Sequence, residues 1–171
     1  KMLSKALLML MKAIIFMDLG VSDKNLLNEF TKDFIKVVDA NKVKYIIVSG
    51  FVAISHGRIR GTEDIDLIIE RIEQNKFEKF HNDLIKSGFE CLQGSNAKDL
   101  FIDYLKDNLS LRYTRKNQLV PQIELKFAKD ELDEQQLNER VKLSLTGLPF
   151  YFSSIETNIA FKEELLKSDK E

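Results

Sequence analysis

The chain alternates between apolar stretches with helical spacing and apolar stretches typical of strands. After Ser22, a predicted helix N-cap, apolar residues recur three or four positions apart as far as Ala40, which predicts an amphipathic helix. The β-rich apolar run over residues 45–48 predicts a strand buried on both faces. A short helix over residues 51–56 is expected to follow it.

The middle of the chain predicts further strands and helices. Strands are expected over residues 64–69, 89–92, 109–114 and 119–127. Helices are expected between the first two of these strands, in a short stretch that ends near Asp107, and over residues 130–140. The first of these helices is predicted to stop near Gly88 and to turn four residues toward the core: Phe77, Phe80, Leu84 and Ile85.

The last part of the chain predicts a hairpin and a helix. Apolar runs over residues 141–145 and 148–152 flank Thr146-Gly147, a spacing that favours a tight turn. A capping-box pattern begins at Ser153 and predicts a helix after it. Hairpins mixed with crossover helices indicate an α+β domain in which helices flank a mixed sheet, with helical extensions at both ends.

We therefore expect a single domain over residues 1–171, with a core over about 22–127 and a C-terminal hairpin and helix over 141–169. A length of 171 residues and an apolar fraction of 44% fit one globular domain and exclude a disordered chain. The net charge of −1 argues against a general nucleic-acid coat or a polybasic membrane binder.

Two features favour a cytoplasmic protein without membrane association. The lone cysteine, Cys91, cannot form an internal disulfide, so nothing indicates an oxidising compartment. The most apolar stretch, residues 6–17, is interrupted by Lys12 and is shorter than the roughly 20 residues that a spanning helix needs.

Candidate chemistry gathers around the strand predicted over residues 64–69. Asp64 and Asp66 alternate with core-facing residues, so their carboxylates share one face of the strand. Mg²⁺ prefers such oxygen ligands, and two ions roughly 3.5–4 Å apart can activate a hydroxyl and stabilise leaving pyrophosphate. Ser49-Gly50, between a strand and a short helix, offers backbone N–H groups to a phosphate. Taken singly, the two aspartates are also typical of a solvated strand face, and the glycine of an ordinary turn.

Together these residues resemble the signature of the DNA polymerase β-like nucleotidyltransferase superfamily: Ser49-Gly50, a spacer, then Asp64-Ile-Asp66-Leu. The stretch Arg60-Gly-Thr62-Glu-Asp64-Ile-Asp66 is similar to a variant found in small, mostly uncharacterised members and in toxin-type relatives of abortive-infection systems. The strong resemblance covers about residues 45–69, and a looser one extends to the end of the chain.

The resemblance implies a nucleotidyltransferase-type sheet and an enzyme that moves a nucleoside monophosphate from an NTP to an acceptor hydroxyl, releasing pyrophosphate. It implies Mg²⁺ or Mn²⁺ held by Asp64, Asp66 and a third carboxylate on a neighbouring strand, for which Glu124 is the best match. The alternative for Glu124 is a solvent-facing residue beside Lys126. The resemblance also implies contacts to the NTP, with ATP as one candidate, from Ser49, Gly50, Arg60 and Thr62.

Ser49 departs from the family pattern, which usually has glycine there, and this motivates a second hypothesis. In it, the chain is a catalytically impaired nucleotide- or partner-binding module of a toxin–antitoxin-type pair. A third hypothesis is a structural α+β protein with an incidental Asp-x-Asp. The identity of the acceptor stays open between RNA, a protein and a small molecule, because the carboxylates that bind the metal do not determine which acceptor is used. A small helical protein partner and a homodimer stay open as well.

Overall fold

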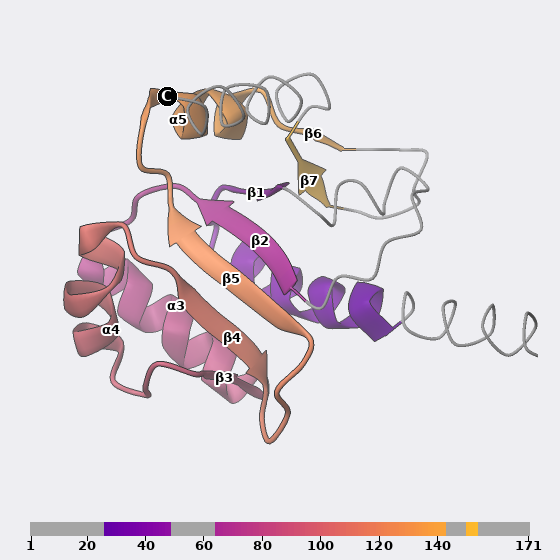
Figure 1. Cartoon of the computed structure of the whole chain (residues 1–171), viewed down its shortest axis with the longest axis vertical. Helices are drawn as coiled ribbons and strands as arrows, with labels where there is room; N and C mark the ends of the chain where they lie inside the picture. Colours follow the sequence, from indigo (N-terminus) through magenta and orange to yellow (C-terminus); the bar gives the residue numbers. More distant parts are fainter. Residues whose placement is uncertain (1–25, 49–63, 143–149, 154–171) are drawn as a thin grey trace, which may run out of the picture.

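A computed structural model describes residues 26–48, 64–142 and 150–153 (Figure 1). In this part of the chain, seven strands form one mixed sheet in the order β3-β4-β5-β2-β1-β7-β6. The strands are β1 (Tyr45–Val48), β2 (Asp64–Ile69), β3 (Phe89–Cys91), β4 (Leu111–Arg115), β5 (Gln122–Phe127), β6 (Val141–Lys142) and β7 (Tyr151–Phe152). β2 pairs with β5 and β1 with β7 in parallel, and the other neighbouring strands are antiparallel. The predicted α+β class with a mixed sheet is confirmed.

Helices pack against both faces of this sheet. A helix over residues 26–40, α3 (Gln74–Lys86) and α4 (Ala97–Asp103) lie on one side, and α5 (Glu131–Asn138) lies beyond the carboxyl end of β5 (Figure 1). The 3-10 helix η1 (Leu105–Asp107) follows α4. α4 begins where its N-cap, Asn96, accepts hydrogen bonds from two backbone N–H groups, a favourable cap.

The main core is aromatic and lies between the sheet and the helix over residues 26–40. Phe34 is fully buried, and its ring meets the rings of Phe80, Phe89 and Tyr113 at centroid distances of 6.4, 5.1 and 5.6 Å. These edge-on arrangements are the ones that aromatic quadrupoles favour. A second, smaller cluster lies on the other face of the sheet, where α5 contributes Leu137 against Ile46, Ile68 and Ala128.

One buried polar pair crosses the main core. His81 of α3 is fully buried, and its Nε2 donates to the Ser95 carbonyl at 3.3 Å, because a carbonyl can only accept. Its Nδ1 then accepts from the hydroxyl of Tyr113 at 2.9 Å. Burial lowers the pKa of His81 and so favours the neutral ring, although the hydrogen bond to Ser95 acts in the opposite direction.

The structure corrects three expectations. Ile85 was predicted to face the core, but it is 40% exposed, and the buried positions of α3 include His81 instead. β5 begins at Gln122 rather than at residue 119, since Pro121 has no N–H for a ladder and Leu119 before it is 75% exposed. β4 begins at Leu111 rather than at residue 109.

Several expectations concern residues that lie outside the described ranges. β6 and β7 pair as the predicted hairpin requires, but the turn itself lies outside them. So do the short helix over residues 51–56 and the helical extensions at both ends. Within the described ranges, no helix has the length and apolar character that crossing a membrane requires.

Replacing Phe34 with alanine is expected to lower the free energy of unfolding by about 3–5 kcal/mol, because the cavity lies where three aromatic rings meet. The exposed Leu119 provides the control: Leu119→Ala should change it by less than about 1 kcal/mol. Urea denaturation measures both, and equal effects would contradict this account of the core.

The buried His81 predicts a pH dependence of stability. Because its folded pKa lies below the ordinary value of about 6.5, the unfolded chain takes up the proton first. The contribution of His81 to the free energy of unfolding is therefore complete above about pH 6.5. It falls as the pH drops toward the folded pKa, by at most about 1.4 kcal/mol per pH unit. Urea unfolding at several pH values should show this loss in the wild type and not in His81→Gln; parallel curves would refute it.

Candidate functional site

The carboxylates singled out in the sequence lie on the face of the sheet opposite the aromatic core, which we call the open face. On β2, Ile65 and Leu67 are fully buried in the main core, so Asp64 and Asp66 alternate onto the open face. On β5, buried and half-buried residues alternate in the same way, and Glu124 is one of the half-buried ones. The alternation along the two strands therefore assigns Asp64, Asp66 and Glu124 to the same face of the sheet.

The parallel pairing of β2 with β5 sets Asp66 and Glu124 side by side. The two residues are register partners, and their strands are adjacent, so their Cα atoms are separated by about 4.8 Å. Asp64 lies two positions along β2, about 6.6 Å from Asp66, opposite Gln122. Asp64 is exposed and Asp66 is half-buried, so a small ligand can approach this part of the open face.

The row continues on both sides of the two carboxylates. Val48, the last residue of β1, is the register partner of Asp66, and it directly precedes Ser49 in sequence. On the other side, Arg112 of β4 is the register partner of Glu124. The row across four strands therefore reads Val48, Asp66, Glu124 and Arg112, in sheet order.

Arg112 is a site residue that the sequence reasoning missed. Its Nη2 lies 3.4 Å from Oε2 of Glu124, and the two side chains are 52% and 30% exposed. Its backbone N–H donates to Oε1 of Gln93 at 2.9 Å, which ties β4 to the segment after β3. The signal was present, because a basic residue between the core residues Leu111 and Tyr113 must face away from the core.

The chemistry of these oxygen donors fits a hard divalent cation. Mg²⁺ and Mn²⁺ prefer carboxylate oxygens, and Mg²⁺ commonly binds one or two carboxylates together with water and substrate phosphates. Across the ranges that the structure describes, no three His, Cys, Asp or Glu side chains form a ready-made ligand group. Asp66 and Glu124 are thus the pair that the backbone brings together, with Asp64 one step along the strand.

The remaining candidates from the sequence cannot be placed. Ser49, Gly50, Arg60 and Thr62 lie outside the described residues. Their roles toward an NTP therefore stay predictions.

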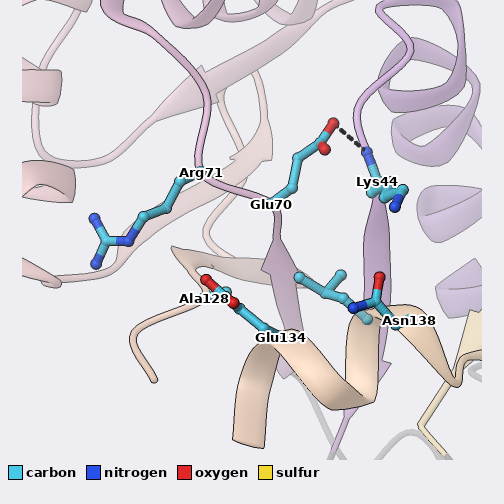
Figure 2. A pocket seen from close by; sticks show the side chains of 7 residues that line it. Lys44, Glu70, Arg71, Ala128, Glu134 and Asn138 are labelled. Carbon is cyan, nitrogen blue, oxygen red and sulfur yellow. Dashed lines mark hydrogen bonds between the residues drawn. The ribbon is translucent and has the colours of Figure 1, made fainter. Parts of the chain in front are cut away.

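A shallow pocket of about 260 Å³ lies elsewhere, at the carboxyl end of β2 (Figure 2). Glu70, in its lining, follows β2 and lies four residues beyond Asp66, about 13 Å along the strand direction. Glu70 accepts a hydrogen bond from the backbone N–H of Lys44 at 3.0 Å, whereas Arg71 extends away and bonds Asn108 (Figure 2). Glu70 and Arg71 therefore both have protein partners at this pocket.

No family model matches the chain, and no curated protein matches it in sequence.

The partly exposed pair of Arg112 and Glu124 is expected to contribute little to stability, because solvent screens it. A double-mutant cycle with Arg112→Gln and Glu124→Gln should give a coupling energy below about 1 kcal/mol in urea unfolding. A coupling of several kcal/mol would show that Glu124 is needed for folding, and activity lost on its substitution would then carry no functional meaning.

Proposed function

We propose that the protein is a metal-dependent nucleotidyltransferase, with a nucleotidyltransferase-type sheet. It transfers a nucleoside monophosphate from an NTP to an acceptor hydroxyl and releases pyrophosphate. The observation that carries the proposal is the register of β2 and β5, which joins Asp66 of the Asp-x-Asp pair to Glu124, 58 positions later in the chain. An incidental Asp-x-Asp would not require an acidic partner on the adjacent strand.

In this proposal, Asp64, Asp66 and Glu124 hold the divalent cation through their carboxylate oxygens. The bound cation would supply charge neutralisation at the phosphates and would acidify the acceptor hydroxyl. The acceptor hydroxyl gives up its proton to solvent as its oxygen forms a bond to the α-phosphorus. The bond from that phosphorus to the bridging oxygen breaks as pyrophosphate leaves with its electron pair. Positioning and electrostatics provide most of the catalysis, so no covalent nucleophile is needed.

The NTP is assigned to the end of β1. Val48 lies beside Asp66, and the next residues in the chain are Ser49 and Gly50, the proposed phosphate contacts. Arg60 and Thr62, shortly before Asp64 in sequence, are assigned to the same ligand. The acceptor, whether RNA, a protein or a small molecule, is not selected by these residues.

One observation favours a second candidate function, a nucleotide- or partner-binding module without turnover. The guanidinium of Arg112 already faces one oxygen of Glu124, so the third carboxylate has a cationic partner in the protein itself. Together with serine at position 49, this is compatible with a catalytically impaired domain of a toxin–antitoxin-type pair. Calorimetry that detects NTP binding, without pyrophosphate release over a long incubation, would favour this module over the enzyme.

The test of the enzyme uses the purified chain, each α-labelled NTP, Mg²⁺ or Mn²⁺, and a cell extract as the source of acceptor. Asp66→Asn should lower metal-dependent pyrophosphate release about 100-fold or more, because it removes a ligand charge while keeping the side-chain shape. The labelled product identifies the acceptor.

The matched control is Glu70→Gln, which removes a carboxylate at the opposite end of β2 and should retain activity. NTP consumption that is unchanged in Asp66→Asn would refute the proposed function.

A further inference from the structure

Arg112 has a geometry that matters for the proposed metal site. It faces Glu124 from β4, while Asp66 faces Glu124 from β2, so the carboxylate lies between a cation and another anion. Like charges directly opposite each other on neighbouring strands repel, and a cation on the far side offsets that repulsion. Arg112 thus serves as the counter-ion of Glu124 in the protein without metal.

The contact is also weak enough to be exchanged. The Nη2–Oε2 distance of 3.4 Å is long for a charge-assisted hydrogen bond, and one nitrogen rather than a two-pronged fork meets the carboxylate. The Arg112 side chain is about half exposed, so its guanidinium can move into water at little cost. A divalent cation, with twice the charge and a smaller radius, competes well for the same oxygen.

We propose that Arg112 is a positioning residue for the metal site: it holds the Glu124 carboxylate in the row beside Asp66 and is displaced from it when the divalent cation binds. The inference rests on the proposed function, because it concerns the same carboxylates. Metal affinity then depends partly on a residue that is not a ligand. Because the Arg112–Glu124 contact must be broken before the cation binds, the free energy of breaking it lowers the apparent affinity for the cation.

The chain offers a matched control for this idea. Lys126 is also a basic residue on the open face, two positions beyond Glu124 on the same strand. Its register partner on β2 is Ile68, so it does not lie opposite a carboxylate on that strand. A substitution of Lys126 therefore removes the same net charge near the site without removing the counter-ion.

The test is calorimetric titration of Mg²⁺ into the full chain without nucleotide. Arg112→Gln should bind Mg²⁺ about three- to tenfold more tightly than the wild type, because the competing cation is gone. Arg112→Lys, which keeps the charge, should stay near the wild type. Lys126→Gln should shift the affinity less than Arg112→Gln does.

A second pair of variants asks whether the effect passes through Glu124. In a Glu124→Gln background, adding Arg112→Gln should change Mg²⁺ affinity by less than about twofold, since there is no carboxylate left to release. A purely structural role would instead lower the melting temperature without tightening metal binding. Equal or weaker Mg²⁺ binding by Arg112→Gln, or the same tightening in Lys126→Gln, overturns the inference.

The two proposals fail in different ways. If the wild type binds Mg²⁺ and Asp66→Asn does not, the metal site stands, and the Arg112 variants alone decide this inference. If the wild type and Asp66→Asn show the same absence of Mg²⁺ binding, the inference falls together with the metal site of the proposed function.

Discussion

The parallel pairing of β2 with β5 is the constraint on which the candidate site depends. Along each strand, every second residue is buried in the aromatic core, so a slip of one position would turn the apolar set outward. The hydrogen bond from the backbone N–H of Ala128, just after β5, to the carbonyl of Ile69, the last residue of β2, continues the ladder at this end. The same apolar pattern that forms the core therefore holds Asp66 and Glu124 beside each other on the opposite face.

The two faces of the sheet have different roles. The core face gains stability from buried aromatic and aliphatic side chains, and the polar pair of His81 and Tyr113 within it is hydrogen-bonded. The open face, as far as the structure describes it, is apolar toward α5, where Ile68 meets Leu137, and is charged toward the start of β2. The charged residues of the candidate site thus lie on the face where substituting them disturbs the main core least.

Local patterns were enough to predict β1 and β2, because short β-rich apolar runs with clear ends leave little choice. They failed at Leu119, whose apolar character suggested that the strand began there. Pro121 has no N–H to donate to a neighbouring strand, and β5 begins only after it. They also failed at Ile85, because spacing alone does not show which of two adjacent apolar or aromatic positions packs inward. The pairing of Asp66 with Glu124 came from the family resemblance and not from the local pattern, since pairing across 58 positions is decided by tertiary packing.

The central claim is that Asp66 and Glu124 share a divalent cation. Anomalous diffraction from crystals soaked in Mn²⁺ tests this most directly, because the metal's signal places it without reference to activity. The account predicts an anomalous peak within coordination distance of oxygens from both carboxylates, with the Arg112 guanidinium withdrawn from Glu124. Mn²⁺ bound only elsewhere, with the Arg112–Glu124 contact intact and no peak between the two carboxylates, would contradict it.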